Sequence, residues 1–320
     1  MLTLADVEAA QFRTKTYVRR TPMLEGDPQP KGRIWLKAEF LQRCGVFKTR
    51  GAFNRQLAAR ERGELDPKLG VVAASGGNAG LANAFVAAQL GVPATVFVPA
   101  TAPEIKVDRL RQYGATVRLI GSEYAEAFTA AQDFVANTGA LFCHAYDQPE
   151  IAAGAGVIGL EILEDLPGVD TIVLAVGGGG LYAGIATVAA SAGVRVVAVE
   201  PTNIPTLHAA LQAGRPSDVT VAGIAADSLG ARQIGRVAFD VAIQTSPVSV
   251  LVEDDDIDAA RNLLWNDYRI PAEHGAAAAL AALTSGVYRP DDGENVAVIV
   301  CGANTDLSTI GPTSRTVSTF

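Results

Sequence analysis

The sequence of 320 residues has few cysteines and no long uninterrupted apolar run. Its three cysteines, Cys44, Cys143 and Cys301, lie far apart, so they provide neither a disulfide framework nor the close spacing of metal ligands. This usage predicts a reducing compartment, and we expect a cytoplasmic protein. Gly, Pro or charged residues interrupt each apolar stretch before it reaches the length of a membrane span. Residues 1–20 also lack the pattern of a signal peptide, so we expect no membrane association.

Charge is also scarce, at 19% of residues, and the net charge is −8. Because basic side chains do not cluster, the composition argues against binding to nucleic acid. The 49% share of hydrophobic residues is enough for a large core. Only 6% of residues are aromatic, whereas glycine occurs 32 times. This balance favours an α/β fold, in which small aliphatic side chains fill the space between a sheet and its helices.

Between residues 70 and 144, short apolar runs alternate with longer segments of helical spacing. The predicted strands are residues 71–74, 94–98, 115–120 and 140–144, and the predicted helices are residues 78–90, 103–113 and 122–137. Glycines close these helices, at Gly91, Gly114 and Gly139. Strands and helices that alternate through such short loops predict a parallel sheet with helices on its faces.

A second series of the same kind follows residue 170. Its predicted strands are residues 171–176, 194–199 and 295–300, and its predicted helices are residues 181–192, 254–268 and 274–283. An earlier strand, at residues 34–38, is expected to join this second sheet, so the first series is inserted into the second. We therefore predict an α/β protein of two domains, each a mostly parallel sheet flanked by helices. Residues 1–46 and 146–320 form the large domain, residues 47–145 form the small one, and the cleft between them holds the site.

Four consecutive glycines, Gly177, Gly178, Gly179 and Gly180, lie between a predicted buried strand and a predicted helix. Without Cβ atoms, their N–H groups can converge on an anion, and the helix N-terminus adds a favourable dipole. The run therefore favours a phosphate-binding loop over a plain turn. A dinucleotide site also stays open on this loop alone, because Glu200 lies where an acid that binds a ribose would be expected.

The segment Ser75-Gly76-Gly77-Asn78-Ala79-Gly80 also joins the end of a predicted strand to the start of a helix. It offers a second anion site, although Ser and Asn at a helix start are equally typical of ordinary capping. Two such sites in two halves of the chain suggest a ligand with a phosphate at one end and a carboxylate at the other.

Lys48 lies between the apolar residues Val46 and Phe47 and the segment Gly51-Ala52-Phe53. Apolar surroundings lower the pKa of a lysine and make its amine nucleophilic. Taken alone, however, a lysine near a helix start is more typical of a solvated surface charge than of a catalytic amine.

The order of these motifs carries more information than any one of them. The lysine segment, residues 39–52, is followed by the Ser75–Gly80 loop, the glycine run and finally Cys301-Gly302-Ala303-Asn304. In this order they resemble the fold-type II pyridoxal-phosphate enzymes, and within them the serine/threonine dehydratase and serine racemase group. The resemblance spans almost the whole chain. It implies a two-domain fold like that of the tryptophan synthase β subunit, with the large domain holding the cofactor.

The resemblance also implies roles for particular residues. Lys48 would hold pyridoxal 5'-phosphate as a Schiff base and move the Cα proton of the substrate. The cofactor would be bound by Lys48, Phe47 beside the imine, Asn78 at the ring hydroxyl, the phosphate cradle Gly177, Gly178, Gly179 and Gly180, and Cys301 beside the ring nitrogen. The substrate carboxylate would be bound by Ser75, Gly76, Gly77, Asn78 and Ala79.

Four positions depart from the pattern of that group. Cys301 stands where the group commonly has a serine. Gly76 stands where its racemases have a second serine, so we expect weak racemisation. Ala79 replaces a histidine that is often found there. Glu200 is the candidate metal ligand, but Thr206 replaces the carboxylate expected six residues on, so a divalent cation is doubtful.

The resemblance predicts a PLP-dependent ammonia-lyase, which converts L-threonine or L-serine to 2-oxobutanoate or pyruvate and ammonia. It also implies a homodimer. Alternatives are the same scaffold acting on 3-hydroxyaspartate or as an amino-acid racemase, and a protein that only binds a nucleotide or an amino acid.

Overall fold

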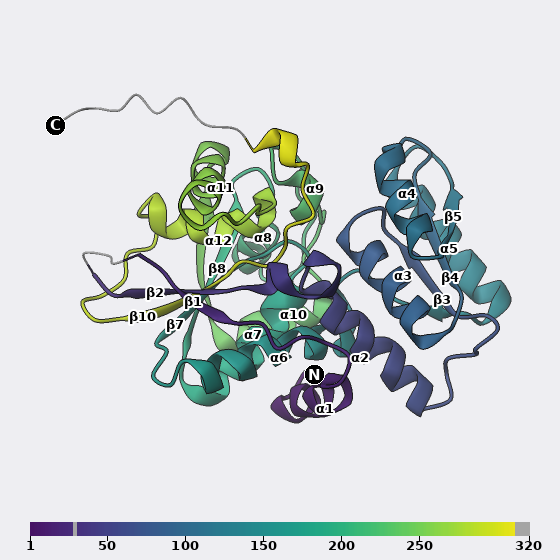
Figure 1. The fold of residues 1–320 in the computed structure, drawn as a ribbon, viewed down its shortest axis with the longest axis horizontal. Coiled ribbons are helices and arrows are strands. Elements are labelled where there is room, and N and C mark those ends of the chain that lie inside the picture. The colour runs from purple at the N-terminus through teal and green to yellow at the C-terminus, as the bar shows by residue number, and fades with distance from the viewer. Residues whose placement is uncertain (28–30, 311–320) are drawn as a thin grey trace.

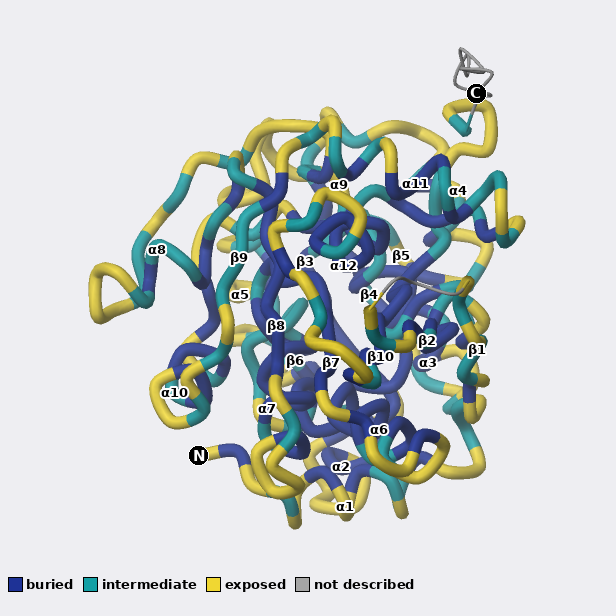
Figure 2. The backbone as a smooth tube through the Cα atoms, turned by 90° about the vertical axis from the view of Figure 1, so that its left-hand side faces the viewer, coloured by how far each residue is buried: buried dark blue, intermediate teal, exposed yellow. Residues whose placement is uncertain are grey.

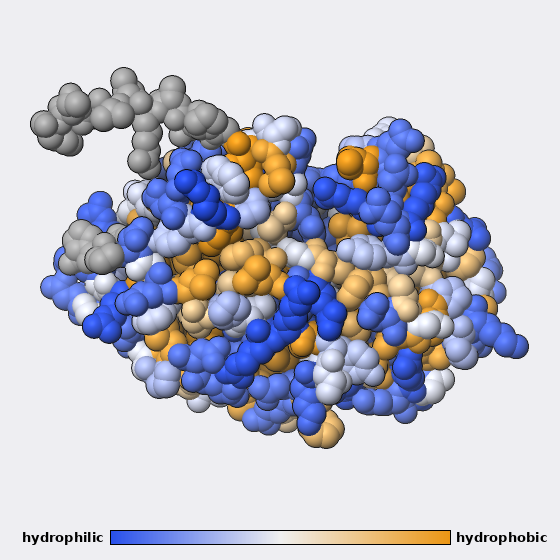
Figure 3. Space-filling view, viewed as in Figure 1, coloured by the Kyte–Doolittle hydropathy of each residue, from blue (hydrophilic) through white to orange (hydrophobic). Residues whose placement is uncertain are grey.

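A computed structural model describes residues 1–27 and 31–310 of the chain. These residues form two lobes, each built on its own sheet, which lie side by side in Figure 1. A notch separates the lobes along the upper edge of the surface in Figure 3. The α/β class predicted from the sequence is confirmed.

The larger lobe contains a six-stranded sheet in the order β1-β2-β10-β7-β8-β9. Its strands are β1 (Met23–Glu25), β2 (Arg33–Lys37), β7 (Thr171–Ala175), β8 (Arg195–Pro201), β9 (Val248–Val252) and β10 (Asn295–Ile299). All neighbours are parallel except β1, which pairs antiparallel with β2. The pairing of Val296 with Ile34 joins strands from opposite ends of the chain, as the sequence predicted.

The smaller lobe contains a four-stranded parallel sheet in the order β5-β4-β3-β6. Its strands are β3 (Val71–Ala74), β4 (Ala94–Val98), β5 (Thr116–Leu119) and β6 (Leu141–Phe142). The strand predicted at residues 140–144 is thus shorter than expected. Cys143 still donates to the carbonyl of Val72, but the N–H of His144 donates to the Gln148 side chain, which turns the chain away from the sheet.

Helices cover both faces of each sheet. They are α1 (Leu4–Thr14), α2 (Lys48–Glu61), α3 (Asn78–Leu90), α4 (Glu104–Gln112), α5 (Tyr124–Thr138), α6 (Pro149–Asp165), α7 (Gly180–Ala192), α8 (Thr206–Ala213), α9 (Ala226–Leu229), α10 (Arg236–Thr245), α11 (Asp254–Tyr268) and α12 (His274–Thr284), with short 3-10 turns at Glu39–Leu41, Arg43–Gly45 and Leu307–Thr309. Gly91, Gly139 and Gly193 end α3, α5 and α7 in the left-handed conformation.

The main core surrounds the six-stranded sheet. Every residue of β7 is buried, as a parallel strand covered on both faces requires, and β8 and α12 run through the same dark-blue interior in Figure 2. The smaller sheet has separate apolar clusters on its two faces. Helix α2 contacts both α6 of the larger lobe and α3 of the smaller lobe, so it links the two cores.

The carboxyl ends of strands from both sheets meet between the lobes. Ser75 follows β3, Gly177 follows β7 and Cys301 follows β10 within two residues of each strand. Because ligands of parallel α/β sheets bind outside the carboxyl ends of the strands, this junction is where the fold predicts a site.

Candidate active site

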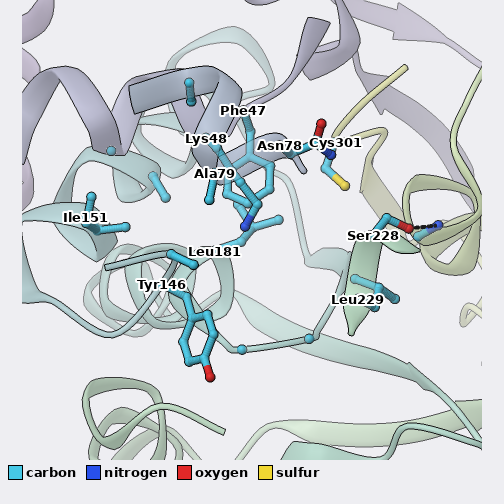
Figure 4. A pocket seen from close by; sticks show the side chains of 18 of the residues that line it. Phe47, Lys48, Asn78, Ala79, Tyr146, Ile151, Leu181, Ser228, Leu229 and Cys301 are labelled. Carbon is cyan, nitrogen blue, oxygen red and sulfur yellow. Dashed lines mark hydrogen bonds between the residues drawn. The ribbon is translucent and has the colours of Figure 1, made fainter. Parts of the chain in front are cut away.

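A cavity between the lobes brings the predicted site residues together. Its lining includes Phe47, Lys48, Asn78, Ala79, Gly177, Gly178, Gly179, Gly180 and Cys301. In the close view of Figure 4, the amine of Lys48 extends into the middle of this group, with Phe47 and Asn78 on one side and Tyr146 on the other. Ser75, Gly76 and Gly77 lie next to the cavity in sequence but are not among the residues that line it.

Lys48 is positioned by the larger sheet. It is the first residue of α2, and the N–H of the preceding Phe47 donates to the carbonyl oxygen of Cys301 at 3.0 Å. Val46 forms a β-bridge with Gly302. The end of β10 therefore fixes the start of the helix, and with it the origin of the lysine side chain.

The surroundings of Lys48 favour a neutral amine. Burial lowers its pKa from the ordinary 10.5, and the ionised forms of Cys301 and Glu273 would only partly oppose this effect. The nitrogen lies 5.0 Å from the centre of the Phe47 ring. No ion pair to Lys48 is formed by any residue within 1–27 and 31–310. A lysine with a lowered pKa can act as a nucleophile and a base.

A buried ion network supports the first turn of α2. The guanidinium of Arg50 donates to both oxygens of Glu39 at 2.8 and 2.9 Å and to both oxygens of Glu161 at 2.7 and 2.8 Å. Lys37 pairs with the same Glu161 at 2.8 Å. All four side chains are at most 5% exposed. Two positive and two negative charges thus balance beneath the turn that carries Lys48.

The glycine run forms a tight loop under the cavity. A Cβ at Gly178 would lie 2.2 Å from two atoms of the Tyr146 ring, and Gly179 has φ +87° with Ala238 packed 2.4 Å from its hypothetical Cβ. Neither position accepts a side chain. Within the described chain, the N–H groups of Gly178 and Gly179 donate no hydrogen bond to protein. Free N–H groups before the N-terminus of α7 can bind an anion.

Asn78 and Ala79, at the end of the Ser75–Ala79 segment, line the cavity from the smaller lobe. The Ser75 hydroxyl accepts a hydrogen bond from the N–H of Gly77 at 3.3 Å, which shapes the turn. The hydrogen bond from Leu81 to the carbonyl of Gly77 is the first of α3, so the N–H groups of Asn78 and Ala79 lie at the open end of that helix. These groups can bind a carboxylate.

Glu273 is a site residue that the sequence did not reveal. Both of its oxygens lie 2.8–2.9 Å from the side-chain nitrogen of Asn78. Burial raises the pKa of Glu273 to about 7, against the opposing effects of the Asn78 hydrogen bond and the Lys48 charge. Burial also raises the pKa of Cys301, so its thiol is neutral. In the sequence, Glu273 looks like an ordinary acidic residue before a helix, which hides its position in the cavity.

Two further residues that line the cavity, His144 and Tyr146, follow the end of β6. The Nδ1 atom of His144 accepts hydrogen bonds from the N–H groups of Tyr146 and Asp147 at 3.2 and 2.8 Å. Burial lowers the pKa of His144, so the ring is neutral with its proton on Nε2. In the sequence His144 is a single histidine at the end of the strand predicted at residues 140–144, and that position was the available signal. Ser228 and Leu229, at the end of α9, complete the rim.

Glu200 lies outside the cavity and supports the fold. It is fully buried, and its oxygens accept hydrogen bonds from the hydroxyl of Thr206 and the N–H groups of Leu207 and His208, each at 2.8 Å. These donors belong to the N-terminus of α8. Among the residues that the structure describes, no group of three or more His, Cys, Asp or Glu side chains could hold a metal ion.

The described part of the chain also has no helix that is long and apolar enough to cross a membrane. The fold and the site together define a two-lobed α/β protein in which a half-buried lysine and a glycine loop with free N–H groups line the same cavity. The family model described as pyridoxal-phosphate dependent enzyme matches residues 14–302. The chain therefore belongs to the pyridoxal-phosphate-dependent enzymes of fold type II, as its motifs indicated.

Individual relatives agree with this assignment. The chain is 36% identical over 317 residues to the L-threonine ammonia-lyase of Thermotoga maritima. The matched region covers 97% of this chain and 77% of that protein. It is 38% identical over 320 residues to the L-threonine ammonia-lyase of Geobacter sulfurreducens, with the same coverage. The structure of serine racemase from Dictyostelium discoideum superposes with a TM-score of 0.87 at 29% identity, over 95% of this chain and 99% of that chain.

Proposed function

We propose that the protein is an ammonia-lyase that uses pyridoxal 5'-phosphate to eliminate the β-hydroxyl of L-threonine or L-serine, giving 2-oxobutanoate or pyruvate and ammonia. One observation carries this proposal: Lys48 and the glycine run with its free N–H groups line the same cavity. A lysine-linked cofactor with a phosphate group needs both features at once, and a nucleotide site needs only the second.

The residues present fit this cofactor. Gly178 and Gly179 leave no room for side chains and offer unbonded N–H groups to a phosphate. The lowered pKa of Lys48 leaves its amine free to react with an aldehyde. Phe47, Asn78 and Cys301 line the same cavity and would contact the cofactor ring. When bound, pyridoxal phosphate supplies the electron sink that makes the Cα proton of an amino acid removable.

The chain itself supplies binding, orientation and proton transfer. The N–H groups at the start of α3 would hold the substrate carboxylate, together with Ser75, Gly76 and Gly77 of the preceding turn. Lys48 Nζ would accept the Cα proton, because a neutral amine in an apolar site is a base at physiological pH. The neutral Cys301 thiol is a weak hydrogen-bonding partner, which favours elimination over reactions that need a long-lived carbanion. The two lobes would exclude water from the reaction.

The names of the relatives support the choice of substrate. Both the Thermotoga and Geobacter proteins are L-threonine ammonia-lyases. The racemase likeness is the alternative that a specific observation favours, because the Dictyostelium structure superposes over nearly the whole chain. Gly76 argues against it, since glycine has no side chain to return a proton to the opposite face. Action on 3-hydroxyaspartate is a narrower alternative on the same scaffold.

A panel of amino acids tests the proposal. The purified protein, saturated with pyridoxal phosphate, is incubated with L-threonine, L-serine, D-serine and 3-hydroxyaspartate. Keto acid, ammonia and the opposite enantiomer are measured. We expect keto acid and ammonia in equal amounts from L-threonine or L-serine, with little D-amino acid. Binding of nicotinamide or adenine nucleotides by a colourless protein would instead favour a nucleotide site.

Location and assembly are further parts of this proposal. The three cysteines are free, which supports a reducing, cytoplasmic setting. We also propose a homodimer, on the basis of the family resemblance. Light scattering after size-exclusion chromatography would test the dimer. No divalent cation is given a role, because the oxygens of Glu200 already accept hydrogen bonds from α8.

A further inference from the structure

A chain of three side chains connects the two lobes across the cavity. Asn78 belongs to the smaller lobe, as the first residue of α3. Its partners belong to the larger lobe: Glu273 precedes α12, and Asn304 follows β10. Asn78 Nδ2 lies 2.8 and 2.9 Å from the oxygens of Glu273, and Asn304 Nδ2 donates to Asn78 Oδ1 at 2.8 Å.

These contacts fix the orientation of the Asn78 amide. Its oxygen must face Asn304, because Asn304 is a donor there, and its NH2 group must face Glu273, because a carboxylate only accepts. Asn304 is itself held by a second hydrogen bond of 2.8 Å to the carbonyl of Cys44. A flip of the Asn78 amide would place two oxygens against each other at Glu273. The larger lobe therefore determines which way Asn78 presents its amide to the cavity.

Glu273 has no other function in the fold that would explain its burial. It occupies the N-cap position of α12, but its side chain accepts no hydrogen bond from that helix. It forms no ion pair with a residue in the described ranges. It is 8% exposed and lines the cavity. A buried carboxylate that caps nothing and pairs with no cation is unfavourable unless it serves a site.

The backbone also makes room for this carboxylate. A Cβ at position 302 would lie 2.3 Å from Glu273 Oε1, so a side chain there would displace the carboxylate from its present position. The N–H of Glu273 donates to the carbonyl of Gly302 at 3.2 Å, which holds the two segments together. Gly302 directly follows Cys301, so the carboxylate is placed against the same strand end that positions Lys48.

We propose that Glu273 is a positioning residue, which holds the Asn78 amide in the orientation that binds the cofactor and docks the substrate loop onto the larger lobe. The inference rests on the proposed function and deepens it. Glu273 acts by accepting the hydrogen bonds of Asn78, so an uncharged side chain of the same shape can replace it. Asn304 supports the same orientation from the other side.

The test compares Glu273→Ala, Glu273→Gln and Asn304→Ala in the full-length protein. Apparent dissociation constants for pyridoxal phosphate are measured by titrating cofactor-free protein and following the visible absorption. KM and kcat for L-threonine and the melting temperature are measured in parallel. Glu294→Gln is the matched control, because Glu294 is a 6% exposed carboxylate of the same lobe that bonds Thr171 and Tyr288 away from the cavity.

Loss of a hydrogen bond to a charged group predicts a rise of about tenfold or more in the cofactor dissociation constant of Glu273→Ala, with a lower kcat. Glu273→Gln should stay within about threefold of the native protein, because its amide oxygen still accepts from Asn78. Glu294→Gln should lower the melting temperature without changing cofactor affinity. Asn304→Ala should weaken cofactor binding less than Glu273→Ala, and it carries the test should Glu273→Ala not fold.

Two results would overturn the inference. One is a Glu273→Ala protein that binds the cofactor as tightly as the native protein. The other is a Glu273→Gln protein as impaired as Glu273→Ala, which would make charge rather than orientation the essential property. In either case a native protein that binds the cofactor and produces keto acid would leave the proposed function intact. A native protein that does neither would refute the function itself.

Discussion

The N–H of Phe47 donates a hydrogen bond of 3.0 Å to the carbonyl oxygen of Cys301. This bond ties the residue before Lys48 to the residue after β10, although the two lie near opposite ends of the chain. The six-stranded sheet therefore fixes the position of Lys48. The glycine run follows β7, which pairs with β10 in the same sheet. The position of the lysine relative to the glycine run is therefore set by one sheet.

The close contact of Tyr146 with the glycine run makes Gly178→Ala a direct test of the proposed phosphate-binding role of this loop. The new methyl group would lie 2.2 Å from the Tyr146 ring, so either the ring or the loop must move. Overpacking of this kind costs about 1–3 kcal/mol, and we expect the affinity for pyridoxal phosphate to fall about tenfold or more. Titration of cofactor-free protein measures this affinity.

A double variant that combines Gly178→Ala with Tyr146→Ala distinguishes a steric effect of the ring from an effect on the backbone of the loop. Removal of the ring should restore much of the cofactor affinity that Gly178→Ala loses, so the two substitutions should be strongly non-additive. Additive losses would show that the ring is not the obstacle.

The buried ion network predicts a large stability effect at Arg50. Arg50→Ala would leave Glu39 and Glu161 buried with only Lys37 to balance them, at a cost of about 3–5 kcal/mol. Urea unfolding of the cofactor-free protein measures this change. The control is Arg111→Ala, because Arg111 and Asp108 are both more than half exposed and their pair should contribute less than about 1 kcal/mol. Equal effects of the two substitutions would contradict the importance of the network.

The raised pKa of Glu273 predicts a pH dependence of stability. Burial, opposed by the Asn78 hydrogen bond and the charges of Lys48 and Lys106, moves this pKa from 4.5 to about 7, and Asp227 adds to the rise. The folded chain thus holds the proton more tightly than the unfolded chain. The resulting stability is complete below pH 4.5 and is lost as the pH rises through 7.

Glu273→Gln removes this titration and isolates its effect. Between about pH 5.5 and about pH 8, the native cofactor-free protein should lose about 2 kcal/mol of unfolding free energy relative to Glu273→Gln. Urea unfolding of both proteins at the two pH values provides the comparison. A constant difference between them would show that Glu273 does not titrate in this window.

Gly76 predicts weak racemisation and offers a way to increase it. A Cβ at this position would meet only Val98, at 3.4 Å or more, so Gly76→Ser should fit with a stability change within about 1 kcal/mol. A hydroxyl there would supply a proton donor, and we expect D-serine formation from L-serine to rise about tenfold or more. Gly77→Ser, whose Cβ would also find room, is the control. An equal rise in both variants would show that position 76 is not special.

Much of the fold could be predicted because its strands and helices are ended by residues that lie next to them in the sequence. Strands β3 and β4 and helices α3 and α11 have the bounds expected from their apolar runs and from the glycines that follow α3 and β3. Helix α6 was not predicted. Its glycines disfavour a helix in isolation, yet Gly154 and Gly156 allow close packing, with hypothetical Cβ atoms 2.7 Å from Gly51 and 2.9 Å from Gly184. Such a helix is stabilised by contacts that only the folded chain provides.

The site could be predicted in part for a similar reason. Lys48, Asn78 and the glycine run lie in motifs whose order indicates their chemistry. Glu273 lies in no such motif, and its proximity to Asn78 arises from the docking of one lobe on the other. His144 is isolated in the sequence and reaches the cavity only because β6 ends early. Contacts between lobes are long-range, so the sequence near either residue does not encode them.

The most direct measurement locates the covalent link between cofactor and protein. Lys48 is one of six lysines in the chain, so the measurement must identify which of them is bound to the cofactor. The protein is loaded with pyridoxal phosphate, reduced with borohydride, digested and mapped by mass spectrometry, with Lys48→Ala and the exposed Lys68→Ala treated alike. We predict that the modification falls on Lys48, persists in Lys68→Ala, and disappears in Lys48→Ala together with keto-acid production. Modification of another lysine, or full keto-acid production by Lys48→Ala, would contradict the proposed enzyme.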